Sequence, residues 1–310
     1  MPYIQKPFRA LRPTPAYAFL MDVLGLGMKE AQRYVDRGRV YQDGVVITEK
    51  NQRLVGLVDV VVYVPESQGL NPCFEEEDFA LFDKPSGLLV HPTSRKTTYS
   101  LYDEILHHFG EEAKIVHRLD RETSGLILVA KHKKAEVALK QCFEKRQVAK
   151  TYLALVRGQM REPLHVNAPL LNNQDYSDIK LRMVVDERGK PSQTDFEPLS
   201  YFPDIDATLV KATPHTGRQH QIRVHLFHVK HPILGDPLYG VPTWVSERYL
   251  DEVLALEERL EWMGANRLLL HANTLAFTFE EKNYTFASLQ DTAALFYAFG
   301  KEKNAYNFMQ

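Results

Sequence analysis

A nine-residue polar stretch, His117 to Gly125, leads directly into an unbroken apolar segment, and this junction constrains the fold more than any other feature of the chain. The segment from Leu126 to Ala130 contains only aliphatic residues and alanine, which predicts a strand buried on both faces. Asp120 therefore lies on a short loop before a buried strand, where a carboxylate is firmly held and still accessible from a cleft. An isolated Asp in such a place more often hydrogen-bonds its own backbone than catalyses.

The polar stretch resembles, position for position, the catalytic motif of the RluA-type pseudouridine synthases. In that family the Asp is the catalytic residue, and it maps onto Asp120. Lys150 and Tyr152 resemble the family's Lys-x-Tyr segment, in which the tyrosine stacks on the target base. The segment from Thr216 to His225 resembles the family's Thr-Gly-Arg-x-His-Gln-Ile/Leu-Arg-x-His motif. The resemblance implies that Arg223, within this motif, forms an ion pair with the catalytic carboxylate.

Three weaker matches extend the resemblance over most of residues 79–279. Lys84 to Gly87 resembles the Lys-Pro-x-Gly segment that precedes the catalytic loop in this family. Gly235 to Gly240 and Arg267 to Ala272 resemble later segments that line the same cleft. One departure is Lys230, where the family commonly has glycine, and it affects no residue with a chemical role.

We expect the motif from Thr216 to His225 to lie on a strand, in which successive side chains point to opposite faces. In such a strand Arg218, His220, Ile222 and Val224 would face one side, and Gln221, Arg223 and His225 would face the other. We therefore expect the candidate site residues of this motif on a strand.

A metal site is the main alternative for this region, because imidazole is the commonest transition-metal ligand. Five of the 12 histidines lie between residues 215 and 231. Their spacing does not favour a metal, since there is no His-Glu-x-x-His pair and His220 and His225 would face opposite sides of the predicted strand. We expect structural or RNA-facing histidines and no metal.

The composition is that of an ordinary globular protein, with 44% hydrophobic and 25% charged residues among 310. The two cysteines, Cys73 and Cys142, give neither a disulfide framework nor a metal pattern, as expected in a reducing compartment. The N-terminus does not resemble a signal peptide, and no run approaches the ~18 apolar residues of a membrane span. We expect a soluble, cytoplasmic protein. No Gly-rich phosphate-binding pattern indicates a nucleotide cofactor.

The charge is distributed unevenly along the chain. The net charge of −2 argues against nucleic acid, because phosphate contacts normally need a basic surface. Between Lys114 and Arg157, however, 11 Lys and Arg stand against four Asp and Glu, an excess of +7. Between Glu247 and Glu261, six acidic residues stand against two basic ones. A protein with one basic face can bind RNA although its total charge is near zero.

The first 65 residues are predicted to form a small separate domain. Residues 1 to about 20 are rich in proline and are expected to form an arm or a loop. Met28 to Arg37 has a helical period. The Asp43-Gly44 turn signal predicts a hairpin, and the β-rich run from Asp59 to Val64 closes the domain.

Three features of this domain resemble the S4-like RNA-binding domain: the arginine-bearing helix, the segment Gly38-Arg39-Val40 and the closing strand. The resemblance implies RNA contacts from Arg33, Arg37 and Arg39. Arg33 and Arg37 are four residues apart and therefore share one helix face. A generic helix–hairpin domain with merely exposed arginines is the alternative.

Residues 66–78 are predicted to be a linker, because they contain proline and glycine and end in the acidic run Glu75 to Asp78. The catalytic domain then comprises residues 79–310. A strand, a turn and a second strand are predicted from Phe79 to Pro92, followed by a helix from Tyr99 to His108.

Further along the chain, Lys133 to Arg146 predicts a helix and Lys150 to Val156 predicts a strand. The inward side of this helix is expected to consist of Val137, Ala138, Leu139 and Phe143. Short strands with few long helices favour the α+β class. We predict a large domain with a mixed, mostly antiparallel β-sheet flanked by helices, plus the small N-terminal α/β domain; the sheet's topology is implied by the resemblance.

The resemblance implies an enzyme that isomerises specific uridines of structured RNA to pseudouridine. An N-terminal module of this type is similar to members that act on large-subunit ribosomal RNA, and transfer RNA is the alternative. Asp120 must stay ionised inside its cleft, and Arg223 is suited to this because a nearby cation lowers the pKa of a carboxyl group. No cofactor is required, since atoms are only rearranged, and a monomer is expected.

Asp120, Tyr152 and Arg223 are the candidate catalytic residues. The candidate RNA contacts in the same domain are Arg118, Arg121, Arg218 and Gln221. Arg118 is expected to fill the place that the target base leaves when it unstacks. A non-catalytic RNA-binding or ribosome-assembly factor and a metal-dependent hydrolase are the competing hypotheses. Whether Asp120 attacks the sugar, attacks the base or removes a sugar proton stays open.

Overall fold

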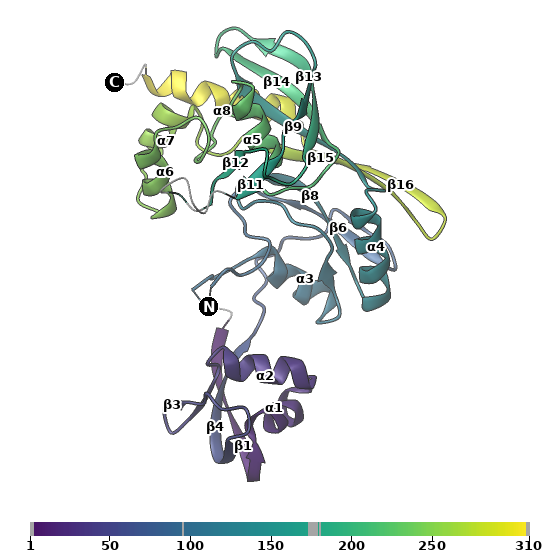
Figure 1. The fold of residues 1–310 in the computed structure, drawn as a ribbon, viewed down its shortest axis with the longest axis vertical. Coiled ribbons are helices and arrows are strands. Elements are labelled where there is room, and N and C mark those ends of the chain that lie inside the picture. The colour runs from purple at the N-terminus through teal and green to yellow at the C-terminus, as the bar shows by residue number, and fades with distance from the viewer. Residues whose placement is uncertain (1–2, 95, 173–178, 180, 308–310) are drawn as a thin grey trace. The chain divides into compact units, whose positions relative to one another are not determined.

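The structure is a computed structural model that describes residues 3–94, 96–172, 179 and 181–307 (Figure 1). The chain forms two compact units. Unit 1 comprises Met1–Gln68 with Pro92–His107, and unit 2 comprises Gly69–His91 with His108–Gln310. No helix in the described part of the chain is both long and apolar enough to cross a membrane.

Unit 1 consists of a four-stranded antiparallel sheet with two helices packed on one of its faces (Figure 1). Its elements are β1 (Tyr3–Pro15), α1 (Ala16–Leu24), α2 (Met28–Asp36), β2 (Val40–Gln42), β3 (Val45–Val46) and β4 (Arg53–Tyr63). The strand order is β1-β4-β2-β3. Ala31 and Val35 of α2 belong to the same buried core as Val58 and Val60 of β4. The predicted helix and hairpin are confirmed.

The prediction of an N-terminal arm is wrong, because residues 3–15 form the long strand β1. This strand pairs antiparallel with β4 from Tyr3 to Pro15, with a register shift between Ala10 and Thr14. Since β1 is an edge strand, the backbone N–H and C=O groups on its outer side have no partner strand. Prolines, which lack a backbone N–H, are tolerated in such a strand. The chain enters α1 directly after Pro15.

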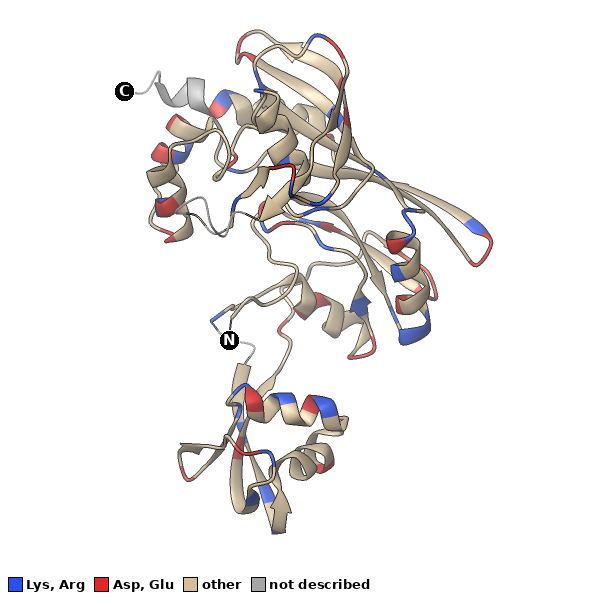
Figure 2. Ribbon diagram, viewed as in Figure 1, with Lys and Arg blue, Asp and Glu red and all other residues tan. Residues whose placement is uncertain are grey.

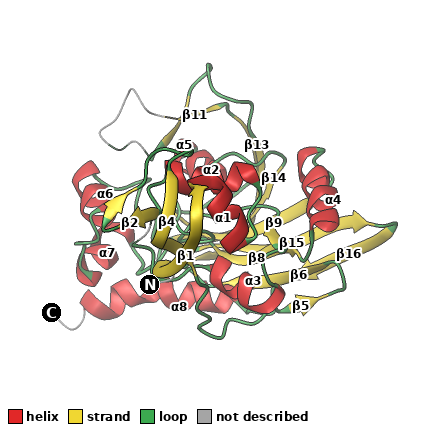
Figure 3. Cartoon of the chain, turned by 90° about the horizontal axis from the view of Figure 1, so that it is seen from below, coloured by secondary structure: helices red, strands yellow, loops and turns green. Residues whose placement is uncertain are grey.

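Unit 2 is built on a large sheet and its flanking helices (Figure 3). The strands of the large sheet are β5 (Phe74–Glu75), β6 (Phe79–Lys84), β7 (Lys114–Ile115), β8 (Ser124–Ala130), β9 (Ala149–Arg157), β10 (Leu164–Asn167), β13 (Gln193–Phe202), β14 (Ala207–Pro214), β15 (Leu270–Phe279) and β16 (Lys282–Ala287). A separate hairpin pairs β11 (Leu170–Asn172) with β12 (Met183–Val185). The remaining helices are α3 (Leu101–Phe109), which spans the boundary of the two units, α4 (Lys133–Glu144), α5 (Gln221–His228), α6 (Thr243–Leu250), α7 (Leu256–Met263) and α8 (Thr292–Asn307).

The strand order of the large sheet is β10-β13-β14-β9-β15-β8-β6-β5, with β16 paired to β15 and β7 paired to β8. All pairs are antiparallel except β8 and β15, which run parallel. The helix α4 packs on β8 and β15, and α8 contacts β9; Figure 3 shows these helices on opposite sides of the sheet. The predicted α+β architecture with a mixed, mostly antiparallel sheet is confirmed.

The strand β8 is buried along its whole length, as its composition predicts. Leu126 and Leu128 on one face pack against Leu139 of α4. The helix α4 is confirmed, but Val137 is 45% exposed and does not face the core as predicted. Gly125, near the start of β8, has φ +110°, and a Cβ at this position would clash with the backbone of Ala272 on β15.

Two strand predictions are wrong. Leu88 to Val90 forms no strand, because this segment turns back toward the side chain of Lys84. Residues 221–228 form the helix α5, not a strand. Their polar side chains are buried, with Gln221 and Arg223 each 4% exposed, so α5 has no exposed polar stripe from which its helical period is recognisable.

Candidate active site

The loop that carries Asp120 lies between β7 and β8 and is held by a buried lysine. Lys84 is fully buried, and its ammonium donates to the carbonyl oxygens of Pro85, Leu88 and Arg121 at 2.9, 2.8 and 3.0 Å. Burial lowers the pKa of Lys84 to about 7, although nearby carboxylates act in the opposite direction. This side chain joins the loop after β6 to the loop that carries Asp120.

His117 holds the beginning of the same loop. Its Nε2 accepts the backbone N–H of Leu128 at 3.0 Å, and its ring stacks on Phe143 with centroids 4.7 Å apart. Burial lowers the pKa of His117 to about 3, so the ring is neutral and Nε2 is available as an acceptor. The imidazole therefore accepts the hydrogen bond from β8 that a carbonyl group of a neighbouring strand would otherwise accept.

Asp120 lies next to the guanidinium of Arg223. Nη1 of Arg223 donates to Oδ2 of Asp120 at 3.0 Å, so the ion pair that the family resemblance implies is present. The side chain of Asp120 is 29% exposed, which leaves part of the carboxylate accessible. Burial raises the pKa of Asp120, but His220 and Arg223 outweigh burial and hold the pKa below its ordinary value. The carboxylate is ionised at neutral pH.

A second carboxylate, Asp236, fixes Arg223. Its two oxygens accept Nε–H and Nη2–H of Arg223, both at 2.8 Å, and Oδ1 also accepts the backbone N–H groups of Leu238 and Tyr239 at 2.8 and 3.0 Å. Burial alone would lower the pKa of Arg223, but Asp236 and Asp120 raise it well above its ordinary value. Arg223 is a fixed cation that two carboxylates share.

His220 is the third group near the carboxylate of Asp120. Its Nε2 lies 3.7 Å from Oδ2 of Asp120, and its Nδ1 lies 3.0 Å from the hydroxyl of Tyr239. The Tyr239 oxygen already accepts the backbone N–H of Met183 at 2.9 Å, so its own hydrogen can go to Nδ1. In this tautomer Nε2 carries the hydrogen that faces Asp120. Burial lowers the pKa of His220 to about 4, so the ring is neutral at neutral pH.

Tyr152 lies on β9 and is 9% exposed. Its partners on the two neighbouring strands are both alanines, Ala212 on β14 and Ala272 on β15. Burial and the charge of Asp120 both raise the pKa of Tyr152, so the hydroxyl stays protonated near the carboxylate. The ring of Tyr152 is therefore flanked by small side chains on both neighbouring strands.

Gln221 is buried at the start of α5, and all its polar atoms have partners. Its amide nitrogen donates to the carbonyl of Gln193 and the hydroxyl of Thr194 at 2.9 and 3.0 Å. Its amide oxygen accepts from the hydroxyl of Thr216 and the backbone N–H of Arg218 at 2.7 and 3.0 Å. Gln221 organises the turn before α5 and presents no free group to a ligand.

The other predicted RNA contacts of unit 2 are arginines at its surface. Arg118 and Arg121 are exposed, and Arg121 forms an ion pair with Glu252 at 2.9 Å. Arg218 is half-buried and donates to the carbonyl of Pro191 at 3.3 Å. In Figure 2, lysines and arginines gather at α4 and the loop after it, while α6 and α7 carry many acidic residues.

In unit 1, Arg33 lies on α2 and Arg37 directly follows its last residue, and both are exposed. Arg39 is half-buried, and its guanidinium lies 4.9 and 5.0 Å from the ring centroids of Tyr3 and Tyr34. The guanidinium of Arg39 is thus largely engaged by aromatic rings.

His271 does not line a cleft, in contrast to the expectation for the segment from Arg267 to Ala272. It is fully buried, and its Nδ1 lies 2.9 Å from the hydroxyl of Ser124, which also accepts from Nη2 of Arg267 at 2.9 Å. These side chains tie the start of β8 to β15.

Three residues near Asp120 were not identified from the sequence: Lys84, His220 and Asp236. The available signal was that each lies in a segment that resembles the family. Nothing in the sequence indicated, however, that Asp236 contacts Arg223 or that Lys84 contacts Arg121.

The prediction that His220 and His225 face opposite sides of a strand is wrong, since His220 precedes the helix α5 and His225 lies within it. His225 is fully buried between the hydroxyl of Thr194 and the carbonyl of Ala168, at 2.9 and 3.0 Å. Within the described ranges, no group of three His, Cys, Asp or Glu side chains has an arrangement that could hold a metal ion.

We expect the free energy of unfolding to decrease as the pH falls below about 6.5. Burial lowers the pKa values of His117, His220 and His271 to about 3, 4 and 4. An unfolded histidine has a pKa of about 6.5, so between these values the unfolded chain binds protons that the folded chain does not. Each such histidine then costs up to about 1.4 kcal/mol of stability per pH unit.

Denaturant unfolding at several pH values measures this slope. The variant His117→Gln keeps an acceptor for the N–H of Leu128 but cannot titrate, and it should reduce the slope by about one proton. An equal slope for both proteins would contradict the assignment.

Comparison with known proteins connects this site to a family. A family model described as RNA pseudouridylate synthase matches residues 78–228. The chain is 40% identical over 289 residues to a protein of Helicobacter pylori (strain J99) described as an uncharacterized RNA pseudouridine synthase, covering 93% of this chain and 96% of that protein.

Two further proteins are similar over a smaller part. The ribosomal large subunit pseudouridine synthase C of Haemophilus ducreyi is 40% identical over 208 residues, covering 66% of this chain and 60% of that protein. The solved structure of human RNA pseudouridylate synthase domain containing 1 matches with a TM-score of 0.59 and 26% identity, covering 73% of this chain and 86% of that chain.

Proposed function

Since this chain belongs to the RNA pseudouridylate synthase family, we propose that it isomerises uridine in large-subunit ribosomal RNA and that Asp120 is its catalytic residue. Several relatives that support the choice of substrate are named ribosomal large subunit pseudouridine synthases. The ion pair between Asp120 and Arg223 is the observation that carries the assignment of the site, because it keeps an accessible carboxylate ionised.

In this reaction the bond between the sugar and N1 of uracil breaks, the base turns, and a bond forms between the sugar and C5. C5 loses its hydrogen and N1 gains one, so the atoms balance within one nucleotide and water. The carboxylate of Asp120 is the charged group that can act on the sugar or the base, and Arg223 stabilises its ionised form. The proposal therefore needs neither a metal nor a cofactor.

We propose that the ring of Tyr152 stacks on the target base. Replacing Tyr152 by Ala should weaken RNA binding about ten- to hundredfold, because stacking of a base on an aromatic ring contributes ~1–3 kcal/mol. Tyr152→Phe keeps the ring and should bind within about threefold of the unaltered chain. Fluorescence titration with RNA measures both, and thermal unfolding shows whether each variant is folded. Equal binding by the Ala and Phe variants would contradict stacking.

For the remaining contacts we propose that Arg118, Arg121 and Arg218 approach the RNA around the target. Arg118 is exposed beside Asp120, so it is suited to the position that the base leaves when it unstacks. We assign Gln221 to the positioning of the turn before α5, since its polar atoms already have partners within the protein.

We propose that residues 1–65 act as an S4-like RNA-binding domain, residues 66–78 as a linker and residues 79–310 as the catalytic domain. Arg33 and Arg37 support the first assignment, because both are exposed, one on α2 and one directly after it, and Arg39 follows them beside Tyr3. We propose further that the chain acts as a monomer in the cytoplasm, where ribosomal RNA is available.

The test of this function is incubation of the purified chain with transcripts of ribosomal and transfer RNA from the same organism, followed by mapping of pseudouridine. Pseudouridine is expected in the large-subunit transcript. Product in transfer RNA alone would overturn the choice of substrate. Stable RNA binding without any product would favour a non-catalytic assembly factor.

A further inference from the structure

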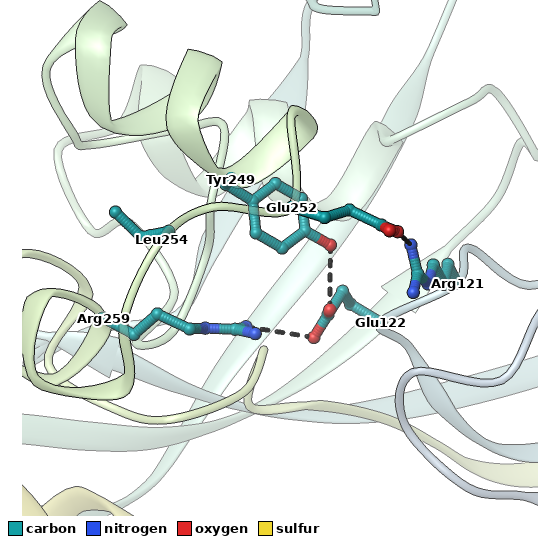
Figure 4. Close-up of a pocket in the computed structure, with 6 residues that line it drawn as sticks. All are labelled: Arg121, Glu122, Tyr249, Glu252, Leu254 and Arg259. Carbon is teal, nitrogen blue, oxygen red and sulfur yellow. Dashed lines mark hydrogen bonds and ion pairs between the residues drawn. The ribbon is translucent and has the colours of Figure 1, made fainter.

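A polar cavity of about 240 Å³ lies beside the loop that carries Asp120 and has no part in the reaction described above. It is lined by Arg121, Glu122, Tyr249, Glu252, Leu254 and Arg259 (Figure 4). The first two residues follow Asp120 directly in the chain, and the other four come from α6, α7 and the loop between these helices. The cavity therefore joins the candidate catalytic loop to the acidic segment of residues 247–261.

The inner wall of the cavity is fixed by hydrogen bonds. The side chain of Glu122 is 11% exposed and accepts from the hydroxyl of Tyr249 at 2.8 Å and from Nη2 of Arg259 at 3.3 Å. Burial and Glu122 raise the pKa of Tyr249, so its hydroxyl remains a donor. Nε of Arg259 is buried and has no hydrogen-bond partner within the described part of the chain. The inner wall therefore holds a fixed guanidinium, with 19% of the Arg259 side chain exposed.

The outer wall is an ion pair that is easily exchanged. Nη1 of Arg121 donates to Oε1 of Glu252 at 2.9 Å, and the two side chains are 50% and 71% exposed. Glu252 has φ +58°, in the left-handed region that a glutamate rarely adopts. Nε of Arg121 also donates to the carbonyl of Gly87 at 3.2 Å, so the guanidinium keeps an anchor when Glu252 leaves.

We propose that this cavity is a subsite for the RNA backbone, in which a phosphodiester beside the target uridine replaces the carboxylate of Glu252 on Arg121. This proposal rests on the function proposed above. A guanidinium binds phosphate and carboxylate oxygens in the same way, and Arg121 is adjacent to Asp120 in the chain. Glu252 is therefore an internal competitor for the phosphate, and the guanidinium of Arg259 adds a second positive charge to the cavity wall.

The test measures the affinity of the large-subunit ribosomal RNA transcript that the unaltered chain modifies, with each variant made in the Asp120→Asn background to prevent turnover. Glu252→Gln should tighten binding about two- to fivefold, because it removes the competing carboxylate from a weak, exposed ion pair. Glu257→Gln is the matched control, since it removes the same charge from an exposed position of α7 outside the cavity. Its effect should be smaller.

The salt dependence identifies the ligand as a phosphate. Arg121→Gln should weaken binding and reduce the slope of log affinity against log salt by about one, as expected for one lost phosphate contact. In the Arg121→Gln background, Glu252→Gln should tighten binding no more than Glu257→Gln does, because the specific effect of Glu252 depends on its ion pair with Arg121.

Equal effects of Glu252→Gln and Glu257→Gln, no effect of Glu252→Gln, or an unchanged salt slope for Arg121→Gln would each overturn the subsite. These results concern RNA that the unaltered chain demonstrably modifies, so they leave the proposed function intact. Failure of the unaltered chain to form pseudouridine would overturn the function instead.

Discussion

The Asp120→Asn protein is expected to bind RNA and to form no measurable pseudouridine. An asparagine keeps the size of the side chain, and its amide oxygen can still accept from Nη1 of Arg223, but it has no negative charge to offer the substrate. Loss of a residue that takes part directly in the chemistry typically lowers the rate by about four orders of magnitude or more. Release of tritium from C5 of labelled uridine in RNA, under single-turnover conditions, measures the reaction.

The matched control for this variant is Asp195→Asn. Asp195 is an exposed carboxylate that also has two close partners, His165 and His215, but lies on β13 and outside the group around Arg223. It should retain activity within about twofold, as surface substitutions usually have small effects. If Asp120→Asn retained more than about one hundredth of the rate, with RNA binding unchanged, Asp120 would not be the catalytic residue.

The Asp236→Asn variant is expected to lose both stability and activity. Asp236 is 1% exposed and accepts four hydrogen bonds, two of them from Arg223. An asparagine has an NH₂ group in place of one of the two carboxylate oxygens. In either orientation of the amide, this NH₂ group faces a donor: Nε–H of Arg223, or the three N–H groups that donate to Oδ1 in the unaltered protein. Removing one partner of a buried ion pair typically costs about 3–5 kcal/mol, because the remaining charge stays buried. Denaturant unfolding measures the loss.

Two comparisons separate the role of Asp236 in the site from a merely structural one. Asp120→Asn leaves Arg223 paired with Asp236 and should be destabilised much less; equal losses would contradict this view of the pair. Asp236 also draws part of the positive charge of Arg223 away from Asp120. In folded Asp236→Asn protein the pKa of Asp120 should therefore fall, and the acid limb of the rate–pH profile should move to lower pH. If the rate–pH profile did not move, the role of Asp236 would be structural only.

The elements that could be predicted from the sequence are those in which burial follows polarity, so that the apolar side chains are buried and the polar ones are exposed. The strand β8 is apolar throughout, α2 and α4 have one apolar side, and the hairpin of β2 and β3 has the Asp43-Gly44 turn. In each case local sequence and burial agree. The ion pair of Asp120 and Arg223 was also available before the structure, but through the family resemblance and not through any local pattern.

The sequence misleads where polar side chains are buried. In α5 the side chains of Gln221, Arg223 and His225 are buried by partners from distant segments, so polarity no longer marks the exposed face. The alternation of polar and apolar residues then imitates a strand. The role of Asp236 was hidden for the same reason, because its contact with Arg223 exists only after the loop before α6 has folded back onto α5.

The parallel neighbour of the strand that follows Asp120 is β15, which lies between β8 and β9 at the centre of the sheet but comes late in the chain, at residues 270–279. During translation, β6 and β8 on one side and β9 and β14 on the other emerge as two half-sheets without the strand that joins them. Until β15 is made, both halves have open apolar edges, the condition in which nascent chains depend on chaperones. Chains that terminate before β15 are expected to aggregate and not to yield a smaller active enzyme.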